Sequence, residues 1–151
     1  MQRTSLAGMA CPVARTLDVV GDWWTLLIVR DAFVGARRFD EFKAVGIADN
    51  ILSARLKKLT EAGIFERRQY QAHPARYEYL LTEKGKELGM VLAAMAWWGK
   101  RWIPGEYRRR LTHRGCGHDV AVSVRCDECD RPLTADELSV ERVQPTPVLA
   151  D

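Results

Sequence analysis

The sequence predicts a mainly helical α+β fold in which several helices accompany one small β hairpin. Apolar residues recur at helical spacing through most of residues 12–62 and again through residues 82–102. Between these stretches, residues 64–70 and 76–81 are rich in β-forming residues and flank a short turn. With 151 residues, 47% of them hydrophobic, the chain is long enough for one such domain with its own core and too short for two ordinary ones.

Two helices are predicted before residue 34. Pro12 favours the first turn of a helix, and Gly21 ends that helix. Asp22 is the expected N-cap of the next helix, because its carboxylate can accept a backbone N–H group. Residues 23–29 are apolar on almost every side, which predicts a helix that is buried all round at the centre of the core.

Two further helices, joined by a tight turn, are predicted before the hairpin. The first is short and amphipathic, with apolar positions at Phe39, Phe42 and Val45. Gly46 closes it, and Asp49 is the candidate N-cap of the second. That second helix buries one apolar stripe, formed by Leu52, Leu56 and Leu59, and Gly63 ends it in a left-handed conformation. A helix, a turn, a helix and a hairpin in this order are the layout of a winged helix-turn-helix module.

The last long helix is predicted from Thr82, its N-cap, to about Trp102. Its apolar face is wider than a single domain of this size requires. We expect residues 1–10 and 141–151 to be flexible tails around a winged domain at 11–103. Residues 111–140 are expected to form a small Cys/His-containing β appendage.

The second helix and the hairpin carry residues suited to binding double-stranded DNA. Short or polar side chains allow a helix to approach base edges in the major groove, and cationic ones donate to guanine or phosphate oxygens. The candidates are Asn50, Ser53, Ala54, Arg55, Lys57, Lys58, Arg67, Arg68, His73 and Arg76. The net charge of +3 says little by itself, because placement matters more than the total. The alternative interpretation is a solvated charged surface.

Several separated motifs, in order, resemble the HxlR-type bacterial transcriptional regulators over about residues 11–103. They are CPV at 11–13, GDWWTLLIVR at 21–30, RFDEF at 38–42, ILSARLKKL at 51–59 and YEYLLTEKG at 77–85. The resemblance implies a winged helix-turn-helix, homodimerisation through terminal helices, and regulation of transcription. We therefore expect a sequence-specific DNA-binding regulator, acting as a repressor, with a small molecule or a redox signal as input.

The main alternative is a redox-sensing or protein-interaction module that uses the winged fold without reading DNA. No nucleophile–base motif, glycine-rich phosphate loop or ordered pair of carboxylates indicates an enzyme. No signal peptide and no apolar run of about 20 residues is visible, so the expected location is the cytoplasm, away from the membrane.

Cys11 directly precedes the first predicted helix. A helix N-terminus stabilises a thiolate, and the resemblance implies a sensing role, because some family members use a cysteine in this context to sense oxidants. The alternative is a partly buried structural cysteine.

The C-terminal part contains His113, Cys116, His118, Cys126 and Cys129. Residues 120–124 alternate like a strand between the two halves of this cluster. Three cysteines and one histidine would satisfy tetrahedral zinc, so the candidate ligands are Cys116, His118, Cys126 and Cys129, with His113 as an alternative. A reduced hairpin with free thiols and a Cys126–Cys129 redox disulfide are the other possibilities.

Tryptophans mark both apolar helices of the predicted domain, at Trp23, Trp24, Trp97, Trp98 and Trp102. Their helical spacing favours core and dimer interface. The alternative is an aromatic-lined pocket between subunits for a small apolar effector.

Overall fold

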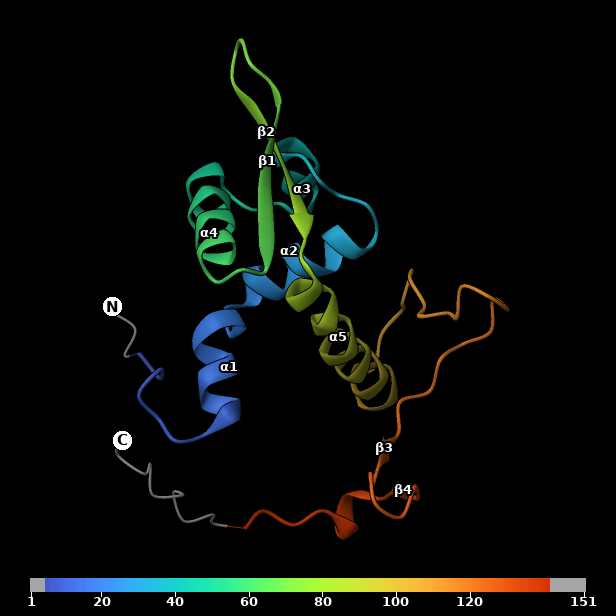
Figure 1. Ribbon diagram of the computed structural model, residues 1–151. Coiled ribbons are helices and arrows are strands. Elements are labelled where there is room, and N and C mark those ends of the chain that lie inside the picture. Colours follow the sequence, from blue (N-terminus) through green and yellow to red (C-terminus); the bar gives the residue numbers. More distant parts are fainter. Residues whose placement is uncertain (1–4, 142–151) are drawn as a thin grey trace. The chain divides into compact units, whose positions relative to one another are not determined.

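The computed structural model describes residues 5–141, which divide into two units at Gly105 (Figure 1). The predicted tail at 141–151, except Glu141, and residues 1–4 lie outside the described residues. The elements of the first unit are α1 (Pro12–Val20), α2 (Trp23–Phe33), α3 (Phe39–Phe42), the 3-10 turn η1 (Lys43–Val45), α4 (Asp49–Glu61), β1 (Phe65–Gln71), β2 (Arg76–Leu81) and α5 (Glu83–Trp102). The winged helix-turn-helix predicted from the sequence is confirmed: α3 and α4 form its helical pair, and β1 and β2 its wing.

The core of this unit lies where α2, α3, α4 and the base of the wing meet. Its buried members are Ile28, Val29, Phe42, Ile47, Leu52, Leu56, Leu59, Ile64 and Phe65. The predicted leucine stripe of α4 therefore faces the core. Burial of this stripe determines which side of α4 is left for solvent.

Helix α2 is not buried all round, and that prediction was wrong. Trp23 is 75% exposed, whereas Ile28 and Val29 are fully buried. The physical reason is that the core covers only one side of α2, and its first turn lies at the edge of the packed region. Apolar sequence alone does not distinguish a helix buried on all sides from one that leaves an aromatic residue at the surface.

Most of the predicted helix ends are confirmed. The Asp22 carboxylate accepts the Trp24 N–H at 3.1 Å, and the Thr82 hydroxyl accepts the Gly85 N–H at 3.1 Å. Gly63 has the left-handed φ of +69° expected after α4. The prediction for Asp49 was wrong, because Ala48 is the N-cap and the Asp49 carboxylate instead pairs with Lys43 Nζ at 2.9 Å.

The wing is an antiparallel hairpin with Phe65 opposite Leu81 and an irregularity between Gln69 and Gln71. The backbone just before α3 continues this sheet, since the Tyr79 N–H donates to the Arg37 carbonyl at 2.7 Å. The wing is thereby anchored to the helix-turn-helix at its base.

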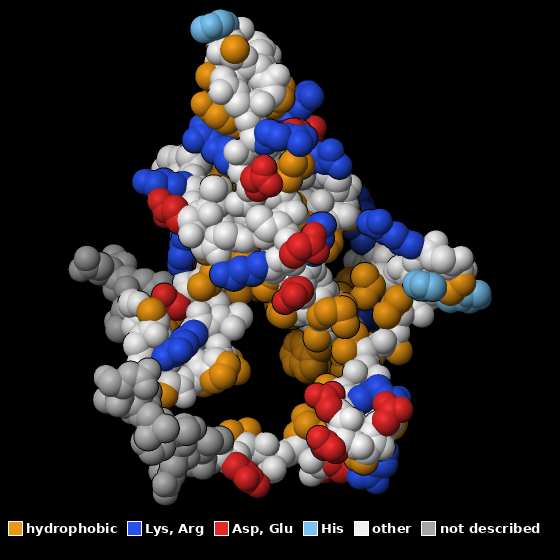
Figure 2. Space-filling model, viewed as in Figure 1, with side chains coloured by type: hydrophobic (Ala, Val, Ile, Leu, Met, Phe, Trp, Pro, Cys, Tyr) orange, Lys and Arg blue, Asp and Glu red, His pale blue; other side chains and the backbone are white. Residues whose placement is uncertain are grey.

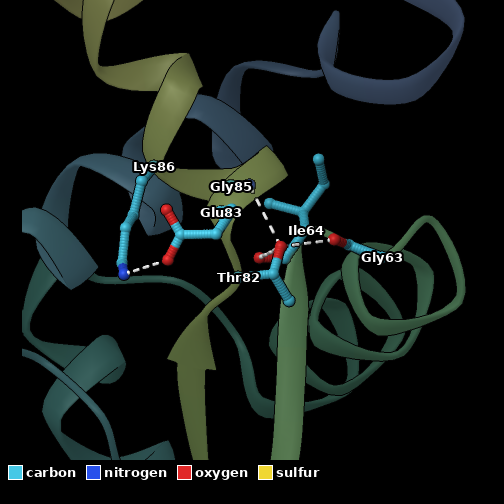
Figure 3. Close-up of polar contacts among 6 residues, drawn as sticks. All are labelled: Gly63, Ile64, Thr82, Glu83, Gly85 and Lys86. Carbon is cyan, nitrogen blue, oxygen red and sulfur yellow. Dashed lines mark hydrogen bonds and ion pairs between the residues drawn. The ribbon is translucent and has the colours of Figure 1, made fainter.

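One junction joins the end of α4, the start of β1 and the start of α5 (Figure 3). The Thr82 hydroxyl lies 2.6 Å from the Gly63 carbonyl and 3.2 Å from the Ile64 carbonyl, and the Thr82 N–H donates to Ile64 at 3.1 Å. Gly85 packs directly on this junction and is buried. Three elements are therefore held by the backbone of Gly63 and Ile64.

The second unit contains the short strands β3 (Val124–Arg125) and β4 (Pro132–Leu133) and the turn η2 (Ala135–Glu137). They form a hairpin in which Val124 pairs with Leu133. The strand predicted at 120–124 was mostly wrong, since only Val124 lies in a named strand. The alternating valines of this segment are not buried against a core, since Val120 and Val124 are both exposed.

Candidate nucleic-acid interface

The solvent face of α4 consists of the residues opposite its leucine stripe. Asn50, Ser53, Ala54, Lys57 and Glu61 are all exposed. Lys57 Nζ lies 3.8 Å from Glu61 Oε1, with the two side chains 78% and 65% exposed. An ion pair this exposed contributes little and exchanges easily. Lys57 is therefore able to donate to another anion.

Arg55 lies on the flank of α4 and is turned toward the protein. Its Nη2 atom pairs with Asp22 Oδ2 at 2.7 Å, and the two side chains are only 28% and 19% exposed. The Arg55 Nε atom is buried and has no hydrogen-bond partner among the described residues. The guanidinium thus links α4 to the first turn of α2.

Lys58 makes a second link of the same kind, because its Nζ donates to the Asp18 carbonyl at 2.5 Å. Asp18 also accepts the Leu6 N–H at 2.8 Å through its carboxylate. Of the candidates on α4, the structure therefore gathers Asn50, Ser53, Ala54 and Lys57 on one exposed face. It directs Arg55 and Lys58 toward α1 and α2.

Two of the arginines of the wing are held by neighbouring side chains. The Arg67 guanidinium lies 3.5 Å from the centre of the Tyr77 ring, a cation–π contact. Arg68 pairs with Glu78 directly across the hairpin at 2.6 Å. His73 and Arg76 are exposed around the turn. Blue side chains surround the base of the wing in Figure 2.

The sequence reasoning missed two further arginines at the base of the wing. Arg37 and Arg38 are exposed, and the Arg38 guanidinium lies 4.5 Å from the centre of the Tyr70 ring. Glu41 Oε2 accepts their N–H groups at 2.7 and 3.0 Å, and these bonds lower the pKa of Glu41. The signal was an arginine pair directly before the first helix of the module.

A hollow beside the wing is lined by Phe39, Asp40, Tyr70, Ala75, Arg76, Tyr77 and Tyr79. Its aromatic lining comes from the wing and α3, not from the tryptophans of α5. No ligand is implied by its shape alone.

An apolar surface runs along α5. Met90, Met95, Trp98 and Trp102 are 73%, 51%, 55% and 62% exposed, and hydrophobic side chains gather over this helix in Figure 2. Within one chain, the tryptophans of α5 are therefore not core residues, and that part of the prediction was wrong. In α1, Val13 and Leu17 are exposed as well.

Cys11 is the N-cap residue of α1 and is half-exposed. The candidate zinc ligands, by contrast, are not brought together. His113 Nδ1 lies 3.1 Å from Cys116 Sγ, in a turn closed by the His113 N–H on the His118 carbonyl. Cys126 and Cys129 occupy a different turn, between β3 and β4. Within residues 5–141, no group of three or more His, Cys, Asp or Glu side chains is arranged to hold a metal ion. None of the described helices is long and apolar enough to cross a membrane.

The sequence model of the HxlR-like helix-turn-helix family matches residues 19–107. An HTH-type transcriptional regulator of Mycobacterium tuberculosis (strain H37Rv) is 38% identical over 132 residues, which cover 85% of this chain and 84% of that protein. The crystal structure of PA1607, described as a candidate transcription factor, is 42% identical with a TM-score of 0.83, covering 93% of this chain and all of that one. The redox regulator HypR in its oxidized form is 35% identical with a TM-score of 0.54, covering 63% of this chain and all of HypR.

Proposed function

Because the chain belongs to the HxlR-like helix-turn-helix family, whose relatives are DNA-binding regulators of transcription, we propose that it acts as a homodimeric, sequence-specific repressor. The observation that carries the proposal is the exposed face of α4 beside a wing of fixed arginines. A helix face without large apolar groups fits the major groove, and flanking guanidinium groups fit phosphates. The cytoplasm, where the chromosome lies, is the proposed location.

In this proposal, base edges are read by Asn50, Ser53 and Ala54, and Lys57 donates to a base or a phosphate. The wing, with Arg67, Arg68, His73 and Arg76, lies along the flanking backbone or the minor groove. Arg37 and Arg38 add phosphate contacts at its base. Arg55 and Lys58 set the position of α4 through Asp22 and Asp18 instead of reaching DNA, because their cationic groups already have partners inside the domain.

Lys57→Ala and Arg67→Ala are each expected to weaken DNA binding about tenfold. Each should also make the slope of log binding constant against log salt concentration shallower by about one unit, because each removes one contact between a cationic side chain and a phosphate. The measurement is a titration at several salt concentrations on the DNA upstream of the protein's own gene. Lys86→Ala is the matched control, because it removes an exposed lysine of α5 that pairs only with Glu83 among the described residues. If the wild type and all three variants give the same titration signal at every salt concentration, the alternative is favoured, namely a redox-sensing or protein-interaction module that does not read DNA.

The homodimer is proposed to form through the terminal helices of the domain, mainly α5, with α1 contributing to the same interface. The support is the set of exposed methionine and tryptophan side chains on α5, which would be costly to leave in water. In a two-fold dimer, the same helix of the partner would cover the side that carries Met95, Trp98 and Trp102.

Trp98→Glu is expected to raise the dissociation constant of the dimer by a factor of about one hundred or more. A two-fold interface contains each substitution twice, and each carboxylate is expected to cost roughly 1.4 kcal/mol, which is a tenfold change. Sedimentation equilibrium would measure the mass over a range of concentrations. Tyr70→Glu is the matched control, because it places a carboxylate at an exposed aromatic position of the wing. A Trp98→Glu protein that keeps the dimer mass at the same concentrations would rule α5 out as the interface.

Two inputs belong to the proposal. Cys11 is the proposed point of entry for an oxidant, supported by its half-exposed N-cap position and by the likeness to a redox regulator. A small apolar molecule between subunits is the second. Zinc is left out, because the candidate ligands do not come together.

A further inference from the structure

The second unit begins with a stretch whose charged side chains are all cationic. Residues 107–118, here called the basic segment, contain no carboxylate side chain and four arginines, namely Arg108, Arg109, Arg110 and Arg114. Residues 119–141, here called the acidic segment, contain seven carboxylates and two arginines. The net charge of +3 for the whole chain therefore does not reveal that one small unit contains two stretches of opposite sign.

The two arginines of the acidic segment are both paired with carboxylates of that segment. Arg125 lies 2.9 Å from Asp130, and Arg131 lies 2.8 Å from Glu137. These two cations are therefore largely neutralised within the segment, which keeps an excess of negative charge.

The arginines of the basic segment are less engaged. Arg110 lies 3.5 Å from Asp119, with the two side chains 70% and 50% exposed. An ion pair this exposed contributes little and exchanges easily. Arg108 and Arg114 are exposed and form no ion pair within residues 5–141. Three guanidinium groups of this segment are therefore able to bind an external anion.

The basic segment is folded back on itself by backbone hydrogen bonds. The Val120 N–H donates to the Leu111 carbonyl at 3.0 Å, and the His113 N–H donates to the His118 carbonyl at 2.9 Å. The Gly117 N–H donates to the His113 carbonyl at 2.7 Å, and Gly117 has the left-handed φ of +73° that such a turn requires. The backbone around Arg114 is thus already ordered, which reduces the entropy lost on binding.

The chemistry of these side chains fits the phosphates of a DNA duplex. A guanidinium group is planar, always charged, and able to donate two parallel hydrogen bonds to one phosphate. A duplex presents one negative charge for about every 1.7 Å of its axis, so several arginines of one segment can each meet a phosphate.

The position of the basic segment in the chain favours DNA over other polyanions. Residues 103–107 are all that separate the end of α5 from Arg108. A duplex held by α4 and the wing is therefore present at a high local concentration. The 20 residues of α5 span about 30 Å, and one turn of duplex is of similar length, about 34 Å. A duplex longer than the site that α4 reads thus offers phosphates at that distance.

We propose that the basic segment binds phosphates of duplex DNA outside the site that α4 reads, through Arg108, Arg110 and Arg114. The inference rests on the proposed function, because it requires DNA already held by the winged domain. It adds a second surface that is independent of sequence, since phosphate contacts carry no base information. The acidic segment repels DNA and confines the contact to residues 107–118.

The test compares two double variants of the full-length chain that remove the same charge from the same unit. Arg108→Gln/Arg114→Gln acts on the basic segment, and Arg125→Gln/Arg131→Gln is the matched control in the acidic segment. Each protein is titrated at several salt concentrations with two duplexes of equal length, one from upstream of its own gene and one of unrelated sequence.

Arg108→Gln/Arg114→Gln should weaken binding at low salt at least about tenfold. It should make the slope of log binding constant against log salt concentration shallower by about two units, equally on both duplexes. The control should stay within about half a unit of the wild-type slope, because its arginines are paired with carboxylates.

Wild-type slopes for Arg108→Gln/Arg114→Gln would overturn the inference. An equal loss in the control would also do so, because total charge would then explain the effect. A loss confined to the upstream duplex would overturn it too, since phosphate contacts are the same on both. If Arg108→Gln/Arg114→Gln instead loses the dimer mass in sedimentation equilibrium without DNA, the basic segment contacts the acidic segment of a second copy, and the DNA contact is refuted.

Lys57→Ala, measured beside these variants, separates this inference from the proposed function. If Lys57→Ala weakens binding and Arg108→Gln/Arg114→Gln does not, the proposed function stands and the inference fails. If the wild type binds neither duplex, both fail.

Discussion

Gly85→Ala is expected to lower the free energy of unfolding by about 3 kcal/mol, at the upper end of the usual cost of overpacking. A Cβ atom at this position would lie 2.2 Å from the Ile64 carbonyl oxygen and 3.0 Å from Leu81 Cδ2. The carbonyl cannot easily retreat, because it accepts the Thr82 N–H, and the Ile64 N–H is itself bonded to Leu59. The added methyl must therefore separate α5 from the start of the wing.

Urea unfolding followed by circular dichroism would measure the change. Glu87→Ala, two residues along the same helix, is the control and should change stability by no more than about 0.5 kcal/mol, because Glu87 is exposed. A Gly85→Ala protein as stable as the wild type would show that α5 can move away from Ile64 without loss of stability.

Asp22→Ala is expected to cost about 2–3 kcal/mol, because Asp22 has two roles. It caps α2, which is worth about 1 kcal/mol. It also pairs with the half-buried Arg55, whose guanidinium would be left without its carboxylate, at about 1–2 kcal/mol more. Asp22→Asn keeps a good cap and removes the charge, so it should cost only about 1 kcal/mol.

A double-mutant cycle with Arg55→Met separates these roles. If the Asp22–Arg55 ion pair links α4 to α2, the losses in unfolding free energy caused by Asp22→Asn and Arg55→Met should be non-additive by about 1 kcal/mol, as measured by urea unfolding. Asp18→Asn is a useful control, since Lys58 bonds the Asp18 backbone carbonyl, which that substitution leaves in place. Strict additivity of Asp22→Asn and Arg55→Met would show that the 2.7 Å contact contributes nothing.

The helices, their order and the wing could be predicted because their signals are local. A cap such as Asp22 acts on residues two positions away, and a leucine stripe repeats every three or four residues. The exposed face of α4 followed from that stripe by elimination. Asp49 was assigned wrongly because aspartate is favoured both at the N-cap and in the first turn of a helix. Only the extended backbone conformation of Ala48 shows that Ala48 is the N-cap.

Contacts between distant residues could not be predicted in the same way. Arg55 meets Asp22 across 33 positions, and Arg38 meets Tyr70 across the base of the wing. Sequence spacing placed Arg55 among the candidates for DNA binding, but it could not show that the Arg55 guanidinium pairs with Asp22 inside the domain. For the Cys/His cluster, nearness along the chain does not bring the side chains of its two turns together within residues 5–141.

The stacked arginines of the wing have a consequence for the entropy of association. A free arginine side chain samples many rotamers, and immobilising a side chain of this kind on binding costs about 0.5–1.5 kcal/mol. Arg67 on Tyr77 and Arg38 on Tyr70 are already restricted in the unbound protein. Most of that ordering accompanies folding, so a phosphate would meet a preorganised planar donor. A lysine at either position would carry the same charge but has no planar group to stack on the ring, so its side chain would lose more conformational entropy on binding.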